Sequence, residues 1–536
     1  MPLPMRIVLH VVAALAGAYM VFAPTIDRGF AVVQTDPGDT ALNHYLLEHT
    51  WRWASDSTYR HALWSPPFYH PQPMVLAYSE NLFGVAPVFW LLRLGLSSAV
   101  AFQVWMMVLS VLNYVAMVLV LRLLPVRHGE RLPVVMVALG GFLWAYGLPQ
   151  HVIIDHPQLI GRFWMPPAAY FAWRFAVAPR GRWLGLALLA TYLQVLTCIN
   201  SGWLLTLGLG VYIPVMVWAN GTWPDVRAFL RHRWKTVAGC GGLWGAAVLS
   251  LVAPYLVANV GQHRDYGECI QFLPSFSSLL AGPEGSWWYT ALFHVRDYVG
   301  SETRFFSGVG FYALLVAAVW FVRAHRHDVK IQSAQRFVTA GAISAVVLFL
   351  ATVDFGEGIS LWWFLRLLPG GLAIRAVGRV EMIFHLFLIP AALIGFTLWV
   401  QNRWPEGRVR QAVLALAAAV VVFEQTGYES IFYKRGDVYG KAERVAGLVA
   451  GTDAFYLAPL PSDNPLYPSV IAMWAGLSAD VPTVNGYSGR LPPGYPELQQ
   501  LTDEEVIVWL GPNFHGKVRI VDLDAEPWDV RDYVLP

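Results

Sequence analysis

Two carboxylates lie just after the first apolar segment of the chain and offer the first candidate chemistry. Asp36 and Asp39 flank a Pro-Gly pair, which favours a turn, so both side chains can face one point. Such a pair can bind a hard divalent cation through its oxygens, or supply a general base. A structural alternative stays open, in which Asp39 or Thr40 caps the helix expected over residues 41–53.

Three more residues of the same loop are candidates for substrate binding: Glu48, His70 and Glu80. His70 ends the run Trp-Ser-Pro-Pro-Phe-Tyr-His, and Glu80 follows a Tyr-Ser pair. Aromatic rings interleaved with Pro, His and Glu suit a site that stacks on a sugar ring or holds a lipid. The alternative is a rigid Pro-rich loop that packs on the membrane surface.

A second polar group, Asp155 and His156, lies in the sequence Gln-His-Val-Ile-Ile-Asp-His-Pro. An Asp-His pair at the mouth of a helix can bind a metal, relay a proton or cap the helix. Together with Asp39, these two residues form the candidate metal set, and Mg²⁺ or Mn²⁺ is the ion that oxygen-rich ligands of this kind would hold.

Two arginines are the remaining candidate residues. Arg375 and Arg379 are spaced i, i+4 and share one face if the segment is helical. Two guanidinium groups near the headgroup boundary suit a phosphate or pyrophosphate. The alternative is that they reach lipid headgroups without further function, and Glu381 could neutralise one of them.

The composition shows what must position these residues. Hydrophobic residues make up 56% of the 536 residues and charged residues 13%, and the mean hydropathy is +0.47. A soluble domain carries roughly 25% charged residues, so lipid must surround much of this chain. The net charge of +2 gives no sign of nucleic-acid binding, and the three cysteines have no metal-ligand spacing.

Hydropathy predicts a polytopic α-helical membrane protein with about eleven transmembrane helices. The first segment could instead be a signal peptide. The Asn-Ser-Gly break at 200–202 favours two spans over one long span. The predicted spans are residues 7–23, 99–121, 132–148, 159–178, 183–199, 203–218, 236–258, 306–322, 337–353, 382–400 and 412–426.

Basic residues gather in every second connection, and the positive-inside rule therefore predicts a cytoplasmic N-terminus. The segments on the other side are then the first loop (24–98), the second loop (149–158), the third loop (259–305), the fourth loop (354–381) and the tail (427–536). Within them, residues 81–95 and 359–368 are expected to form amphipathic helices on the bilayer surface.

The tail differs in its pattern of apolar residues and turns from residues 1–426, the predicted transmembrane module. Residues 454–460, 505–510 and 517–523 alternate or run apolar over strand lengths, between Pro- and Gly-rich turns. We expect a small α/β domain outside the membrane, of about 110 residues, with a modest core of its own.

This layout resembles the GT-C glycosyltransferases, membrane enzymes that depend on polyprenyl-phosphate-linked sugars. The shared features are one span, a long first loop that opens with an Asp motif, an interfacial helix and an acidic second loop. The resemblance implies that Asp36 or Asp39 is the catalytic base or a metal-site residue, that Asp155 and His156 match the second-loop acid, and that Arg375 or Arg379 holds the donor phosphate. The run Thr-Val-Asn-Gly-Tyr-Ser-Gly (483–489) is similar to tails of bacterial membrane proteins related to the YfhO-like group.

The resemblance implies transfer of a sugar from a polyprenyl-phosphate donor to a glycan, lipid or protein acceptor, on the outer face of a bacterial inner membrane. The first loop lacks the Asp-Glu pair of the protein O-mannosyltransferases, which argues against protein hydroxyls as acceptors. Two other classes stay open. A lipid-linked saccharide transporter or flippase predicts a polar path across the bundle, and a non-enzymatic envelope assembly protein predicts recognition by the tail alone.

Overall fold

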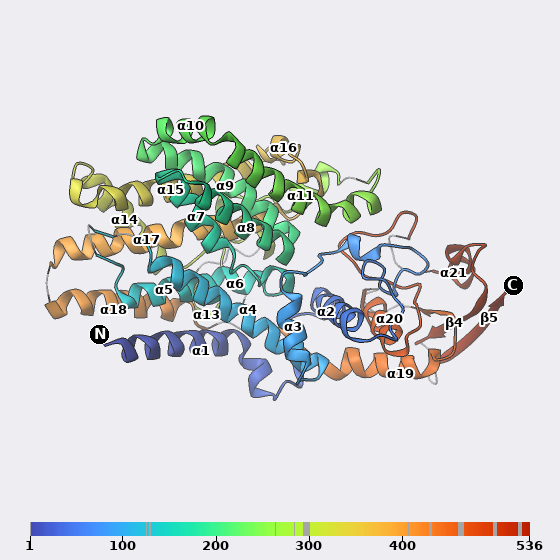
Figure 1. Cartoon of the computed structure of the whole chain (residues 1–536). Coiled ribbons are helices and arrows are strands. Elements are labelled where there is room, and N and C mark those ends of the chain that lie inside the picture. The colour runs from blue at the N-terminus through green and yellow to red at the C-terminus, as the bar shows by residue number, and fades with distance from the viewer. Residues whose placement is uncertain are drawn as a thin grey trace.

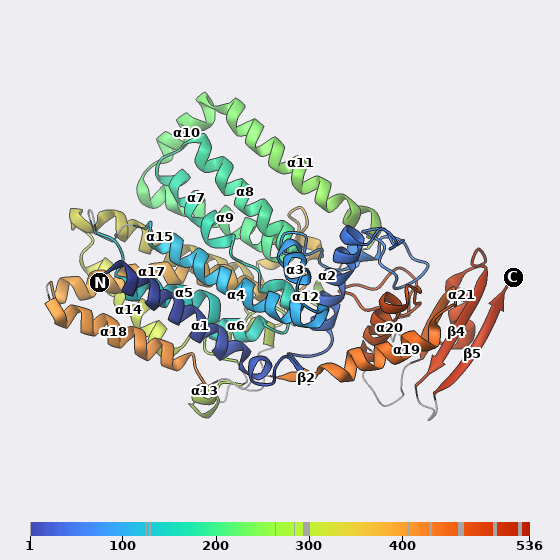
Figure 2. The same ribbon diagram turned by 60° about the horizontal axis from the view of Figure 1, so that its bottom comes forward.

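A bundle of helices continues at one end into a smaller region that carries strands (Figure 1 and Figure 2). The two termini lie at opposite ends of the molecule, the N-terminus beside the bundle and the C-terminus in the strand region. The computed structural model describes residues 2–124, 126–127, 130–262, 264–283, 285–292, 301–405, 407–427, 431–458, 466–496, 501–523 and 528–536.

Six helices of the described chain are long and apolar enough to cross a membrane: α1 (Leu3–Asp27), α4 (Ser98–Leu121), α9 (Ile199–Asn220), α11 (Trp234–Ala258), α15 (Gln332–Thr352) and α17 (Glu381–Arg403). The remaining predicted spans also fold as helices, which are shorter or less apolar: α5 (Val134–Tyr146), α7 (Met165–Val177), α8 (Gly181–Thr197), α14 (Val309–Ala324) and α18 (Gly407–Glu424). A helical membrane protein is thus confirmed in outline, while the number of crossings stays a prediction.

Helix α17 forms the centre of the bundle. Its most apolar stretch is 94% buried inside the protein, against α14, α15 and α5. By contrast, the equivalent stretch of α11 is 6% buried, and α11 packs mainly on α8 at the edge of the bundle. A helix that is apolar all round and enclosed by others is a core element, whereas α11 leaves most of its apolar surface for lipid.

Two helices cover residues 183–218, as expected, but the break lies at Cys198, and residues 200–202 belong to the first turn of α9. Cys198 has extended backbone angles between α8 and α9, and the two helices pack against each other. The first N–H groups of α9 have no partner within the helix, and Glu80 supplies one. Its carboxylate accepts the backbone N–H groups of Ile199 at 2.6 Å and Asn200 at 3.1 Å. Glu80 therefore holds the first loop onto the α8–α9 turn.

The two predicted interfacial segments are only partly helical. Residues 81–95 contain the short helix α3 (Ala86–Arg93), and residues 359–368 contain a single turn, α16 (Trp362–Leu365). Several large apolar side chains around α16 are exposed, at 66% for Phe364 and 66% for Leu367, whereas Trp362 is buried. An exposed apolar surface of this kind is expected where a loop lies against lipid.

The tail contains helices and a small mixed sheet. Its elements are β2 (Phe432–Lys434), the one-turn π-helix η8 (Gly436–Gly440), α19 (Lys441–Val449), β3 (Ala454–Ala458), α20 (Leu466–Ala479), α21 (Asp503–Leu510), β4 (Gly516–Asp522) and β5 (Asp529–Leu535). The strand order is β3-β4-β5, with β3 parallel and β5 antiparallel to β4. The strands expected at 454–460 and 517–523 are present as β3 and β4, although residues 459–460 lie outside the described residues.

The strand expected at 505–510 is wrong, because these residues form α21. Thr502 and Glu505 make a capping box, in which the hydroxyl accepts the Glu505 N–H and the carboxylate accepts the Thr502 N–H. Val506 and Leu510, one helical turn apart, point into the core. The Thr-x-x-Glu signature was the signal that should have outweighed the apolar run.

The tail packs closely on the first loop. Strand β1 (Val32–Gln34) pairs antiparallel with β2, and α20 lies against α2 (Asp39–Ser55). The Trp474 indole donates to the Ala41 carbonyl at 3.2 Å, and the Arg52 guanidinium donates to the Leu477 carbonyl. One hydrophobic cluster runs from the bundle through α2 into β3 and β4. The first loop is thus enclosed between the bundle and the tail.

Candidate active site

Asp39 is the first residue of α2, and its carboxylate joins segments that are far apart in the sequence. Oδ2 lies 2.6 Å from Nδ1 of His156, and Oδ1 accepts the Tyr487 phenol at 2.7 Å. The helix cap is Gly38, and no side chain caps α2, so the capping interpretation of Asp39 and Thr40 is wrong.

His156 continues this contact into a row of alternating charges. Its Nε2 lies 3.0 Å from Oε1 of Glu302, and the Nε of Arg379 donates to Oε2 of the same carboxylate at 2.7 Å. We call Asp39, His156, Glu302 and Arg379 the charged row. Its members come from the first, second, third and fourth loops, so these four loops meet at one end of the bundle.

The charges of the row stabilise one another. Burial alone lowers the pKa of His156, but hydrogen bonds with Asp39 and Glu302 raise it to about 9, so the ring is an imidazolium at neutral pH. Burial likewise opposes ionisation of the two carboxylates. The charge of Arg379 and the hydrogen bond from His156 nevertheless hold the pKa of Glu302 below its usual range. The hydrogen bonds from His156 and Tyr487 do the same for Asp39.

A glycine lets the third and fourth loops approach closely enough to form the row. The short helices η4 (Ser301–Thr303) and η7 (Val377–Val380) meet at Gly378. A Cβ on Gly378 would lie 2.3 Å from the Glu302 carbonyl oxygen, far inside contact distance. The absence of a side chain at Gly378 therefore brings Arg379 to Glu302.

Asp36 lies beside the row but has a different environment. Its Oδ1 accepts the Gly38 N–H at 2.7 Å, which closes the predicted turn, and the residue is exposed. Partial removal from water, together with the neighbouring charge of Asp39, raises the pKa of Asp36. Asp36 is therefore an accessible carboxylate whose affinity for a proton is increased.

The two acids that contact His156 do not converge on one point in this arrangement. Asp39 and Glu302 lie on opposite sides of the His156 ring, at Nδ1 and Nε2, so the three groups cannot reach one ion without moving the ring. Among the residues that the structure describes, no group of three His, Cys, Asp or Glu side chains could hold a metal ion. Asp155, the other candidate ligand, is half-buried next to His156.

The two candidate phosphate-binding arginines differ in what they already contact. Arg379 is paired with Glu302, and its side chain is 11% exposed. Arg375 is half-buried with its guanidinium over the Phe272 ring, 4.9 Å from the centroid. The guanidinium itself makes no hydrogen bond or ion pair with the described residues. Burial and the nearby charge of Arg264 lower the pKa of Arg375. Arg375 is thus the arginine that remains available for an anion.

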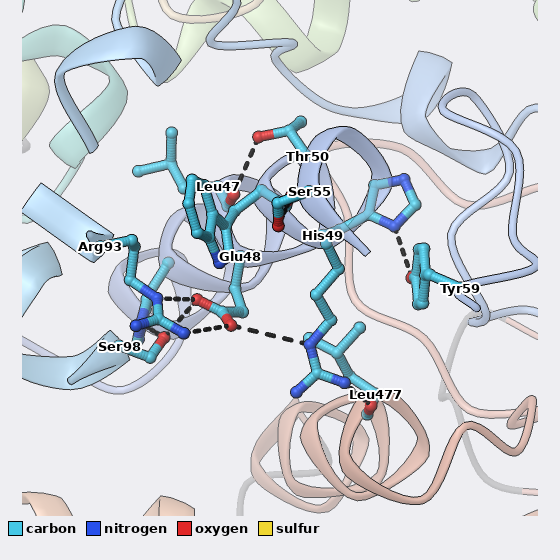
Figure 3. Close-up of polar contacts among 12 residues, drawn as sticks. Leu47, Glu48, His49, Thr50, Ser55, Tyr59, Arg93, Ser98 and Leu477 are labelled. Carbon is cyan, nitrogen blue, oxygen red and sulfur yellow. Dashed lines mark hydrogen bonds and ion pairs between the residues drawn. The ribbon is translucent and has the colours of Figure 1, made fainter. Parts of the chain in front are cut away.

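Glu48, a candidate for substrate binding, is occupied by structural contacts (Figure 3). The buried carboxylate accepts Nε and Nη2 of Arg93 at 2.9 and 3.1 Å and the Ser98 hydroxyl at 2.6 Å. Arg52 lies 3.6 Å from the same carboxylate. These contacts tie α2 to the end of α3 and the start of α4.

We therefore expect Glu48→Gln to act on stability and not on substrate binding. The amide cannot accept both arginine hydrogen bonds and the serine hydroxyl, so the free energy of unfolding should fall by about 2 kcal/mol. Wild-type and variant proteins can be compared by chemical denaturation and by titration with polyprenyl-phosphate sugars, the ligands that the sequence leads us to expect. A raised Kd without a loss of stability would restore Glu48 as a substrate-binding residue.

His70 contacts none of the residues of the charged row and instead contacts the tail. Its carbonyl accepts the Trp509 indole at 2.8 Å, its ring packs on Phe514, and burial lowers its pKa to about 4. The ring borders a cavity of about 290 Å³ within the Pro-rich part of the first loop. The third candidate, Glu80, caps α9 as described above.

Two residues of the site were not found from the sequence. Glu302 is one of several acids in the third loop, and nothing local distinguishes it from the others. Tyr487 lies in the Asn-Gly-Tyr-Ser-Gly run of the tail, which was noticed only as a resemblance. In both cases the missing information was which distant segment the residue contacts.

The sequence matches no protein-family model and no curated protein. Two glycosyltransferases are among the solved structures that align with it. The Archaeoglobus fulgidus oligosaccharyltransferase, solved with Zn and sulfate, is 12% identical over 96% of this chain and 68% of its own, with a TM-score of 0.45. The arabinofuranosyltransferase AftD from Mycobacteria is 15% identical over 84% of this chain and 30% of its own, with a TM-score of 0.41. TM-scores this low do not establish a common fold, so the chemistry is argued from the residues of this chain.

Proposed function

We propose that this protein is a membrane glycosyltransferase that moves a sugar from a polyprenyl-phosphate donor to an acceptor hydroxyl on the predicted outer face. One observation carries the proposal. An accessible carboxylate, Asp36, lies beside the buried charged row, whose last member, Arg379, is close in the chain to Arg375, a guanidinium with no ion pair among the described residues. The proposal is supported because a carboxylate and a guanidinium lie at the same end of the bundle.

Arg375 is the group that would bind the donor phosphate. A guanidinium binds phosphate oxygens strongly and keeps its charge at any physiological pH. The exposed apolar side chains around α16 lie in the same loop, where a polyprenyl chain could remain in lipid while its phosphate reaches Arg375. Arg375 would also stabilise the negative charge that develops on the leaving phosphate.

Asp36 is the group that would activate the acceptor. The acceptor oxygen attacks the anomeric carbon, the bond from that carbon to the phosphate oxygen breaks, and its electron pair leaves with the polyprenyl phosphate. Asp36 takes the acceptor proton, for which its raised pKa and free oxygen suit it better than Asp39, whose two oxygens are engaged. The charged row acts as the rigid frame behind this chemistry.

The test is transfer from a panel of polyprenyl-phosphate sugars by the full chain in lipid nanodiscs, with and without Arg375→Met. We expect the KM of the donor to rise at least tenfold in the variant, since one charge-assisted hydrogen bond is lost. The control is Arg444→Met, because Arg444 also lies over an aromatic ring, that of Trp528 at 4.9 Å, but in the tail. Absence of sugar release from every donor by the wild-type protein would disprove the proposed function.

A further inference from the structure

The tail supplies a side chain to the active site. Tyr487 donates its phenol proton to Asp39 at 2.7 Å. The direction of this bond follows from the two groups, because a carboxylate only accepts hydrogen bonds and the phenol is the donor. The Tyr487 oxygen keeps its lone pairs, so toward a ligand it can act only as a hydrogen-bond acceptor.

The position of Tyr487 is fixed from two sides. The first loop pairs with the Tyr487 loop through backbone bonds from Tyr69 N–H to the Asn485 carbonyl at 3.0 Å and from His70 N–H to the Thr483 carbonyl at 2.9 Å. From the tail, the Asn485 side chain accepts the Leu457 N–H at 2.7 Å and donates to the Leu457 carbonyl at 2.9 Å. A side chain held this firmly is suited to positioning a substrate.

Tyr487 and Asp36 present their oxygens to the same place. A methyl carbon built on Gly38 would lie 2.9 Å from Oδ1 of Asp36 and 3.4 Å from the Tyr487 oxygen. Asp36 is exposed and Tyr487 is half-buried. As a carboxylate, Asp36 also only accepts hydrogen bonds. This part of the site thus offers two neighbouring acceptors.

We propose that the acceptor is a neutral carbohydrate, held by two adjacent hydroxyl groups, one on Asp36 and one on the Tyr487 oxygen. A lipid alcohol or a serine or threonine side chain has a single hydroxyl proton and satisfies only one of the two oxygens. An anionic acceptor is repelled by the carboxylate of Asp36. A sugar with neighbouring hydroxyls satisfies both, and the hydroxyl on Asp36 is the nucleophile. This inference rests on the proposed function and makes Tyr487 a positioning residue for its acceptor.

The experiment compares acceptors of different chemistry, and it compares the wild-type protein with a variant that lacks the Tyr487 oxygen. Wild-type protein and Tyr487→Phe are assayed in nanodiscs with the donor that wild type uses best. Four kinds of acceptor are compared: methyl glycosides with adjacent hydroxyls, their deoxy analogues that lack one of the two hydroxyls, octanol and a threonine peptide. We expect kcat/KM on the intact glycosides to exceed that on the other three probes at least tenfold. Tyr487→Phe should remove this preference. It should lower kcat/KM on the intact glycosides about tenfold and leave kcat/KM on the deoxy analogues unchanged.

The control variant is Tyr495→Phe. Tyr495 is a buried phenol of the tail whose hydroxyl has no hydrogen-bond partner in the described part of the chain, so its loss should change no acceptor preference. Equal losses on intact and deoxy acceptors in Tyr487→Phe, or no loss, would overturn the inference, as would faster transfer to the peptide or to octanol. A wild-type protein that releases no sugar to any acceptor, water included, would instead refute the proposed function on which the inference rests.

A second measurement does not depend on activity. Asp39→Asn, Tyr487→Phe and the double variant form a cycle in thermal unfolding, which isolates the energy of the contact between the two side chains. Non-additive losses are expected. Additive losses would show that Tyr487 does not reach Asp39, and the inference would fail.

Discussion

Asp36→Asn is expected to lower the rate of sugar transfer by about 10²–10⁴-fold, the range that removal of a general base typically costs. Asparagine keeps the size of the side chain and can still accept the Gly38 N–H, so the turn before α2 is preserved. It cannot take the acceptor proton. The measurement is kcat under saturating donor and acceptor, with thermal unfolding as the check that the fold is unchanged.

Asp56→Asn is the matched control for this prediction. Asp56 is an exposed acid of the same loop, at the other end of α2, where it accepts the Thr58 N–H at 2.9 Å. Its loss should leave transfer within about twofold of wild type, because a surface substitution away from the site changes little. If Asp36→Asn keeps full activity while Asp39→Asn loses it, the base is Asp39 and the assignment from hydrogen bonding is wrong.

Three residues of the charged row could be predicted from the sequence, because the residues next to each of them form a recognisable pattern. Asp39 stands out by its turn, His156 by its Asp neighbour and Arg379 by its spacing from Arg375. The alternation of basic connections predicted that the loops carrying these residues lie on one side of the membrane. The structure brings these loops together at one end of the bundle. Their roles in catalysis stay predictions.

The sequence could not separate functional carboxylates from structural ones. Glu48 and Glu80 look like site residues because they lie in a polar, aromatic loop, yet one pairs with Arg93 and the other caps α9. A carboxylate is assigned to either role by the partner that the fold brings to it. Such partners come from other segments, and no pattern within the first loop encodes them.

The second large effect is expected at the centre of the charged row, for Glu302→Gln. Glu302 is 10% exposed and lies between two cations, His156 at 3.0 Å and Arg379 at 2.7 Å. A glutamine removes the negative charge and turns one N–H₂ group toward a partner that also donates. The variant leaves a buried guanidinium without its counter-charge, and breaking a buried pair in this way costs about 3–5 kcal/mol. We expect a fall of that size in the free energy of unfolding, measured by chemical denaturation, together with loss of transfer.

Glu268→Gln tests whether this loss comes from burial and not from the charge of the third loop. Glu268 also pairs with an arginine, Arg264 at 2.8 Å, but its side chain is 44% exposed. Water screens that pair, so its removal should cost less than about 1 kcal/mol and leave transfer intact. Similar small losses in the free energy of unfolding of both variants would mean that solvent reaches the charged row. The imidazolium between two carboxylates would then no longer explain why four loops meet at this point. A large loss confined to Glu302 would show that the row holds the second, third and fourth loops against α2, the condition that Asp36 and Arg375 need in order to act on one substrate.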